Sequence, residues 1–394
     1  MLLNPQPWAE DGTLFINNAI HMGIDSIFHV YAGYLNLTAR IITYIAFKGS
    51  EITGNGIMLT PLIMNIQAII ISVLCIVFMC SSHFDWLSSF RNRVVTALFI
   101  LLLPGIEEVF GNATNINWWL GLFQFLVTLY FVKHNSFPTI FITILYILSS
   151  LSGPMIIIST FIIVALTLYN TIIHKKAMGK LNVVFILISV TTTAIQLLIS
   201  LNMRAPAKDI LPNIRNFFVM YPKTVFVGVY DRLMFVEYQH TVQFFQITTS
   251  TIIGFILLIV CVRICDRRLL IFSTLYIFLL MLLTFKGATF LFGLYKDDFI
   301  DVAQRYFFVP FAILIFMIFT SIKIKGEMRL INRIVTVLLL GLYLSNIIIN
   351  FRLTPLIDYH WKNEVVNYDR YSSVQCQIPI NPKGFGMAIP CKKS

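Results

Sequence analysis

Long apolar runs separated by short polar segments dominate the chain between residues 58 and 349. A transmembrane helix needs about 20 consecutive, mostly apolar residues, and this pattern predicts ten spans. The spans cover residues 58–82, 94–108, 115–133, 137–150, 153–172, 181–201, 246–264, 269–286, 303–322 and 333–349. Two of them, 94–108 and 137–150, are short. They are expected either to tilt or to be half-helices that end at Pro104-Gly105 and Gly153-Pro154 and line a cavity within the protein.

The first 57 residues lack a comparable apolar run. Residues 12–22 and 34–48 alternate apolar and polar faces, which predicts helices lying in the membrane interface. The alternative that 34–48 inserts as a short helix stays open. We therefore expect an all-α polytopic membrane protein in three parts. These are a loop region (1–57), a transmembrane bundle (58–349) with a long loop at 202–245, and a tail (350–394).

The basic residues predict an orientation for this bundle. Lysine and arginine collect in five short connections, at 90–93, 132–134, 174–180, 263–268 and 323–333. Short basic loops stay on the cytoplasmic side. The other connections, at 106–117, 148–153, 202–245 and 287–301, should then lie on the opposite side. Both the 1–57 region and the tail belong to that non-cytoplasmic side.

Composition agrees with a membrane protein. Hydrophobic residues make up 58% of the chain and charged residues only 12%, with a mean hydropathy of +0.81. Soluble domains carry about 25% charged residues, so this chain has too little polar surface to cover a water-facing fold. The net charge of +11 is spread between apolar runs, unlike the basic face of a nucleic-acid-binding domain. Residues 1–12 have neither the basic nor the apolar region of a cleavable signal peptide.

The six cysteines fall into two groups. Four lie in or beside apolar runs and are expected to be buried thiols; they are Cys75, Cys80, Cys261 and Cys265. Cys376 and Cys391 lie in the polar tail. A disulfide can form there if the tail is extracytoplasmic, and the spacing alone leaves both states open.

Two adjacent acids, Glu10 and Asp11, are the sharpest chemical feature. Acids held at a membrane surface can serve as a general base, because a desolvated carboxylate has a raised pKa. They can also bind a divalent cation. The alternative is that Asp11 is a solvated cap at the start of the helix predicted over 12–22.

Several stretches of the chain carry a resemblance to a known family. They read WAEDG (8–12), YAGYLNLTARI (31–41), NATNINWWLGLF (112–123), SSLSGPMIII (149–158), QRYFFVPFAIL (304–314) and INPKGFGMAIP (380–390). Together they resemble bacterial multi-spanning glycosyltransferases of the GT-C type. The nearest likeness is to the O-antigen-modifying glucosyltransferases of serotype-converting phages, which act on lipopolysaccharide. Family members usually have a transmembrane helix before the acidic motif, whereas Met1 lies nine residues before Glu10. A further leading helix would give eleven spans.

The resemblance implies an enzyme of the bacterial inner membrane. It would move a sugar, glucose in the nearest relatives, from a polyprenyl-phosphate donor to a lipid-linked or O-antigen glycan on the periplasmic face. Asp11 would be the base that accepts the acceptor's proton, and Glu10 its partner or a metal ligand. No cofactor is implied with certainty, and the need for a divalent cation stays open.

Candidate binding residues follow from their chemistry and expected side. Arginine grips phosphate with two parallel hydrogen bonds, so the donor phosphate is assigned to Arg305, Arg40 and Lys286. Interfacial snorkelling is the alternative for the cations. The acceptor sugar is assigned to Tyr31, Tyr34, Glu107, Glu108, Asn112, Asn115, Trp118 and Tyr306. An exposed loop is the alternative for the two glutamates, and a membrane aromatic belt for the tryptophan.

Two other functions compete with this interpretation. A transporter or flippase of lipid-linked sugars should carry ionisable residues within its spans and repeat symmetry, but the predicted spans are nearly free of charge. An O-antigen polymerase or ligase would rely more on arginine and histidine than on a leading acidic pair. The chain has no HExxH, GxSxG or Gly-rich phosphate motif. Metalloproteases, serine hydrolases and nucleotide-dependent enzymes are therefore not expected.

Overall fold

The computed structural model describes residues 2–202, 267–287, 305, 308–321, 337, 341 and 357–392, except 83, 88, 104–105, 135–138, 174 and 176–178. This part of the chain is mostly helical, as predicted, but the tail contains two β-strands, so the expectation of an all-α fold is wrong there. Two of its helices, α3 (Thr60–Cys80) and α9 (Lys180–Asn202), are long and apolar enough to cross a membrane. The predicted span 246–264 and nearly all of 333–349 lie outside the described residues, so the count of ten spans stays a prediction.

The remaining long helices lie where the apolar pattern predicts them. They are α6 (Ile116–His134), α7 (Ile140–Ser150), α8 (Ile156–Ile172), α13 (Arg267–Gly287) and α15 (Phe308–Ser321). The predicted span 94–108 contains two helices, α4 (Phe90–Leu101) and the short α5 (Ile106–Val109). α4 ends just before Pro104, because proline disfavours helix in the residues that precede it. The expected interruption at this position is confirmed.

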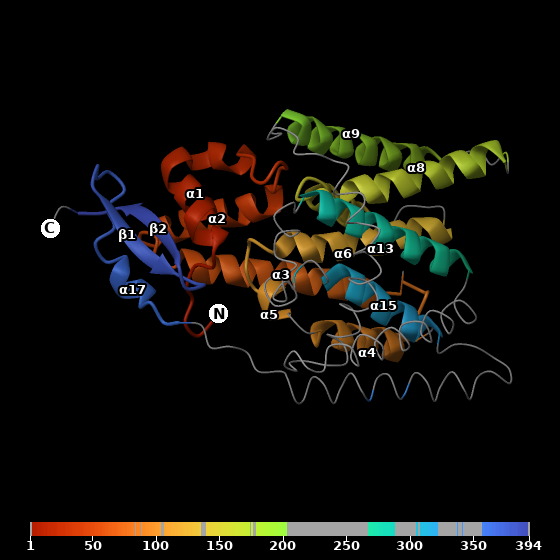
Figure 1. Ribbon diagram of the computed structural model, residues 1–394, viewed down its shortest axis with the longest axis horizontal. Helices are drawn as coiled ribbons and strands as arrows, with labels where there is room; N and C mark the ends of the chain where they lie inside the picture. The colour runs from red at the N-terminus through yellow and green to blue at the C-terminus, as the bar shows by residue number, and fades with distance from the viewer. Residues whose placement is uncertain are drawn as a thin grey trace, which may run out of the picture.

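The N-terminal region is a compact group of short helices at one end of the bundle (Figure 1). It contains a π-helical segment η1 (Asp11–Ile16), α1 (Asn17–Met22), a 3-10 segment η2 (Gly23–Phe28) and α2 (Leu37–Ile52). The helices predicted over 12–22 and 34–48 are therefore confirmed as helices. α2 buries Ala39, Ile42, Ala46 and Phe47 along one face, at the three- and four-residue spacing of an amphipathic helix. It packs against α3.

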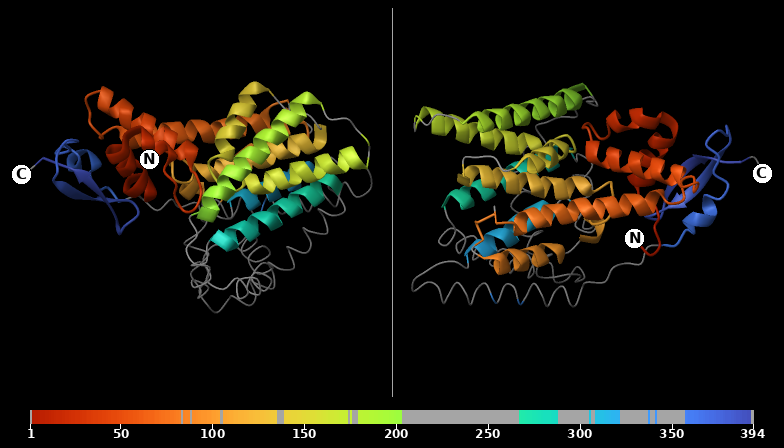
Figure 2. Two further views of the ribbon diagram at one scale, coloured as in Figure 1. Left: turned by 90° about the horizontal axis from the view of Figure 1, so that it is seen from above. Right: turned by 180° about the vertical axis from the view of Figure 1, so that it is seen from behind.

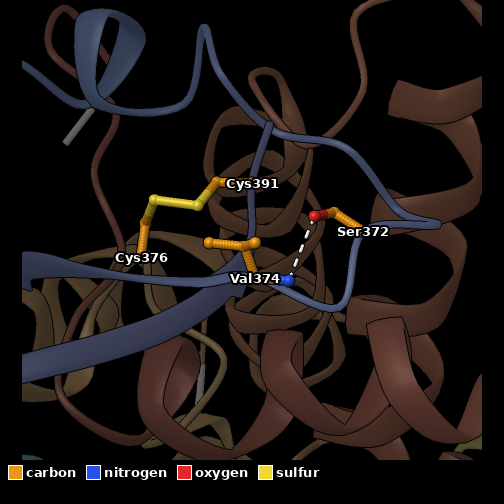
Figure 3. Close-up of a disulfide and its surroundings, with 4 residues drawn as sticks. All are labelled: Ser372, Val374, Cys376 and Cys391. Carbon is orange, nitrogen blue, oxygen red and sulfur yellow. Dashed lines mark hydrogen bonds between the residues drawn. A yellow bond between two sulfur atoms is a disulfide. The ribbon is translucent and has the colours of Figure 1, made fainter. Parts of the chain in front are cut away.

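The tail folds onto this N-terminal region. It forms the short helix α17 (Trp361–Glu364) and an antiparallel hairpin of β1 (Gln375–Ile380) and β2 (Phe385–Pro390), with Gln375 opposite Pro390. A disulfide joins Cys376 to Cys391 (Figure 3), so the oxidised alternative is confirmed. Cys75 is buried as expected and Cys80 is half-buried, while Cys261 and Cys265 lie outside the described residues.

The hairpin packs tightly on η1. The strand bridge between Trp8 and Asn381 starts this contact, and Gly12 lies beneath the hairpin. A Cβ atom at Gly12 would meet Ile380 Cδ1 at 2.6 Å and Pro7 Cβ at 3.0 Å. Only glycine permits this close approach, and two patches of the family resemblance thus lie in contact.

Both views of Figure 2 show the N-terminal region and the tail at the same end of the helices. The described connections separate into two sets by their contacts. Loops predicted on the non-cytoplasmic side contact the N-terminal region: Ala113 and Thr114 bond to Asp11, and Leu151 accepts from Leu37 N. Loops predicted on the basic side contact one another elsewhere, since Asp85 pairs with Lys133 and His134. The alternation inferred from charge therefore agrees with the contacts.

Candidate functional site

Asp11 is anchored to the turn that precedes α6. Its Oδ1 accepts hydrogen bonds from Thr114 N at 2.7 Å and from Thr114 Oγ1 at 2.6 Å, and its Oδ2 accepts one from Ala113 N at 3.3 Å. The side chain is only 2% exposed, so the alternative of a solvated helix cap is wrong. Burial raises the pKa of Asp11, and the three hydrogen bonds lower it because they favour the ionised form. Burial has the larger effect, and the resulting pKa is about 7. Near neutral pH this carboxyl can therefore hold or release a proton.

Glu10 points toward a different group of residues. Its Oε1 accepts a hydrogen bond from the Tyr31 hydroxyl at 3.2 Å. Its Oε2 is buried and has no hydrogen-bond partner among the described residues. Burial and the Glu10 carboxylate raise the pKa of Tyr31, whereas the charge of Arg305 acts in the opposite direction. Glu10, Tyr31 and Arg305, from three distant stretches of sequence, thus share one electrostatic environment.

Arg40 is a buried cation one turn into α2. Its side chain is 2% exposed, and Nε and both terminal nitrogens lack hydrogen-bond partners among the described residues. The guanidinium lies over the ring of Phe15, 4.7 Å from its centroid. Burial lowers the Arg40 pKa from 12.5 to about 10 and Tyr31 partly counters this, so the group stays charged at neutral pH. An unpaired charge in this position costs several kcal/mol (~3 or more), which an anionic ligand would offset.

A set of polar contacts fixes α2, and with it Arg40. Gln196 on α9 accepts from Leu35 N at 3.0 Å and donates to Leu35 O at 3.1 Å and Ser150 O at 3.3 Å. The Thr38 amide donates to Ser152 Oγ at 2.9 Å. These buried bonds connect the start of α2 to α7, α9 and the turn after α7. The second and fourth patches of the family resemblance meet in this contact.

The acceptor candidates of the 112–118 segment are mainly structural here. Asn112 Oδ1 accepts from Asn115 N at 2.9 Å and closes the turn before α6. Asn112 and Asn115 are buried and Trp118 is 7% exposed, so protein covers the indole ring. Tyr34 lies beside Tyr31, with which it forms a backbone bridge, and its hydroxyl accepts from Asn117 Nδ2 at 3.5 Å. This turn holds Asp11 in place and borders the site.

Other predicted site residues fall outside what the structure describes. The backbone of Glu107 and Glu108 belongs to α5 and that of Lys286 to α13, but their side chains are not described, and neither is Tyr306. Among the described residues, no group of three or more histidine, cysteine or acidic side chains could hold a metal ion.

Sequence reasoning missed several residues of this site. Thr114, Phe15 and Asn117 carry no local signal, because their roles arise from contacts across more than 20 positions of sequence. Gln196 does carry one, since a glutamine inside an otherwise apolar run must find a buried partner. Comparisons of the chain with protein-family models, curated protein sequences and solved structures find no match.

Proposed function

We propose that this chain is a polytopic inner-membrane glycosyltransferase. It moves a hexose, taken as glucose from the family resemblance, from a polyprenyl-phosphate donor to a lipid-linked or O-antigen glycan on the periplasmic face. The observation that carries the proposal is Arg40, which is buried, has no hydrogen-bond partner among the described residues and interacts electrostatically with Tyr31, whose hydroxyl donates to Glu10. A cation and a carboxylate that flank one tyrosine suit a substrate with a phosphate at one end of the reacting bond and a hydroxyl at the other.

The donor phosphate is assigned to Arg40 and Arg305. The charge of Arg305 lowers the pKa of Tyr31, and Tyr31 raises the pKa of Arg40, so both arginines lie within electrostatic range of Tyr31. A guanidinium binds phosphate with two hydrogen bonds and needs no proton transfer. As the bond between the anomeric carbon and the phosphate oxygen breaks, negative charge grows on the leaving polyprenyl phosphate. The two arginines would stabilise that charge in a site with little water.

The acceptor proton is assigned to the acidic pair. The acceptor hydroxyl oxygen attacks the anomeric carbon while its proton passes to a carboxylate, so a direct displacement inverts the anomeric configuration. Sequence reasoning chose Asp11, and a pKa of about 7 suits a base. Its two oxygens, however, already accept three hydrogen bonds, whereas Glu10 Oε2 has no described partner. This pattern favours Glu10 as the base and Asp11 as the residue that positions it.

A transfer assay tests the proposal and separates the two acids. Purified enzyme is mixed with polyprenyl-phosphate glucose and isolated O-antigen acceptor. The rate of product formation is measured from about pH 5 to about pH 9, which brackets the Asp11 pKa of about 7. We expect Glu10→Gln to lower transfer about 100-fold or more, the usual contribution of a general base. Glu51→Gln is the matched control, because Glu51 lies on the same helix as Arg40 but pairs with Arg370 and Lys48.

The outcomes are distinct. If Asp11 is the base, Asp11→Asn loses transfer over the whole range and the wild-type rate rises through pH ~7. If Glu10 is the base, the Asp11→Asn variant still transfers sugar at a measurable rate, but this rate no longer increases near pH ~7. Transfer that is unchanged in both variants would remove the proposed site. Donor binding without any transfer would instead favour a carrier of lipid-linked sugars.

A further inference from the structure

A groove lies at the end of the bundle opposite the proposed site. It has a volume of about 650 Å³ and runs between α8 and α13, with the C-terminal end of α6 beside it. Its walls are apolar: Phe161 and Ala165 project from α8, and Ile271 and Leu275 from α13. Figure 1 shows these helices side by side. The groove is therefore a slot between two helices and not a water-filled polar pocket.

The two ends of the groove differ in chemistry. At one end the lining is apolar, with Phe161 on α8 and Leu275 on α13. At the other end Lys133 and Arg268 line the groove together with Asn170. From Phe161 to Asn170 the helix rises roughly 14 Å. A ligand of this shape has a polar, anionic end and a long apolar part.

The end of the groove lined by Lys133 and Arg268 lies beside the lysine- and arginine-rich loops. Lys133 Nζ contacts Asp85 Oδ1 at 2.7 Å and lies 4.9 Å from the centre of the Trp86 ring. Arg268 is the last residue of the basic stretch 263–268 and is exposed. Basic side chains between membrane helices on the cytoplasmic side attract anionic headgroups. The two cations are thus placed where a lipid phosphate would lie.

The rim of the groove is strongly apolar and faces outward. Phe161 is 58% exposed and Ile271 66% exposed, although each is a large side chain whose transfer out of water is worth about 2 kcal/mol. Neighbouring Leu168 and Ile172 on α8 are also exposed. This surface is suited to hydrocarbon, so an acyl chain can enter the groove sideways from the bilayer.

We propose that the groove binds one anionic phospholipid of the cytoplasmic leaflet, with an acyl chain between α8 and α13 and the phosphate at Lys133 and Arg268. The inference rests on the membrane placement in the proposed function but not on the transfer chemistry. Loss of the sugar-transfer proposal would therefore leave the lipid-site proposal intact, and loss of the lipid site would leave the sugar-transfer proposal intact. The site is distinct from the donor site, which lies at the other end of the helices.

Native mass spectrometry of the full chain in detergent tests this lipid site. The protein is mixed with phosphatidylglycerol or with zwitterionic phosphatidylcholine, and retained lipid is counted. We expect one phosphatidylglycerol to be retained in preference, and binding to weaken about fivefold for each of Lys133→Gln and Arg268→Gln. Arg267→Gln is the matched control, because Arg267 is the adjacent arginine and does not line the groove.

A second variant separates the acyl-chain contact from the charges. Ala165→Phe fills the groove without altering any charge and should expel the bound lipid. Inorganic phosphate should not displace the lipid, because it lacks the apolar part. Equal retention of both lipids, or retention unchanged in Ala165→Phe and in the double variant Lys133→Gln/Arg268→Gln, would overturn the proposal. Transfer activity measured on the same samples reports separately on the proposed function.

Discussion

The two ends of the helix bundle treat their charged residues in opposite ways. At the basic end, Asp85 lies half in solvent and pairs with Lys133 and His134, while Arg93 donates to the carbonyls of Cys80 and Leu87. At the other end, Arg40 is buried without a hydrogen-bond partner and Glu10 keeps one unsatisfied oxygen, within the described residues. Pairing at a surface is ordinary, whereas unpaired burial is costly.

Under the proposed function, this difference reflects the chemistry assigned to the buried end. A fold can leave a charge buried and unpaired only if the surrounding packing supplies the free energy for it. Here the surrounding structure includes a hairpin closed by a disulfide, a glycine with no room for a side chain and a glutamine that holds the start of α2. The predictions below test whether the contrast between the two ends has this functional origin.

The largest expected effect concerns Asp11 and pH. The folded protein holds the Asp11 proton up to a pKa of about 7, whereas the unfolded chain releases it near 3.8. The free energy of unfolding should therefore fall as pH rises from about 4 to about 7, by about 4 kcal/mol. Asp11→Asn should remove this slope. The measurement is thermal unfolding in detergent at a series of pH values, and parallel curves for wild type and variant would contradict it.

A neutral residue in place of Arg40 should stabilise the fold. Arg40→Met keeps the apolar stem and removes the unpaired charge, so we expect a gain of about 2 kcal/mol in unfolding free energy together with loss of sugar transfer. Arg93→Met at the other end is the control, and it should lose stability because Arg93 donates to two carbonyls. A destabilised Arg40→Met protein would show that Arg40 has a structural partner and would weaken the phosphate assignment.

The contact between η1 and the hairpin should depend on the size of residue 12. Gly12→Ala places a methyl group 2.6 Å from Ile380 Cδ1 and 3.0 Å from Pro7 Cβ, so the Ile380 side chain must move, at a cost of about 1 kcal/mol. Gly49→Ala on α2 is the matched control, because its nearest neighbour lies at an ordinary 3.5 Å. That change should be neutral or stabilising, since alanine favours helix. Chemical unfolding of both variants gives the comparison.

The smallest effect should come from the basic end. Asp85→Asn breaks the pairs with Lys133 and His134, but these groups are partly solvated. We expect a loss of about 0.5 kcal/mol at low salt and less at high salt. A loss several times larger would mean that this end is also a buried charge site, and the contrast between the two ends would disappear.

Much of the fold was predictable because it depends on local patterns. Apolar runs located α3, α6, α8 and α9 within a few residues, and Pro104 predicted the end of α4. The alternating basic loops predicted which connections share an end. The site was only partly predictable. Glu10, Asp11, Arg40 and Arg305 could be chosen from residue type and expected side, but nothing local indicated that Asp11 bonds to Thr114 or that Arg40 lies over Phe15.

The sequence by itself determined the helical class, the grouping of the loops and the chemical types available to a site, because these follow from hydropathy period and charge. Only the tertiary structure decided which acid is saturated by hydrogen bonds and which cation has no hydrogen-bond partner in the described part of the chain. It also decided that the tail hairpin packs on the acidic motif. Hydrogen bonding and burial of this kind depend on contacts between segments up to several hundred positions apart. Such contacts produce no periodic pattern in the amino-acid sequence.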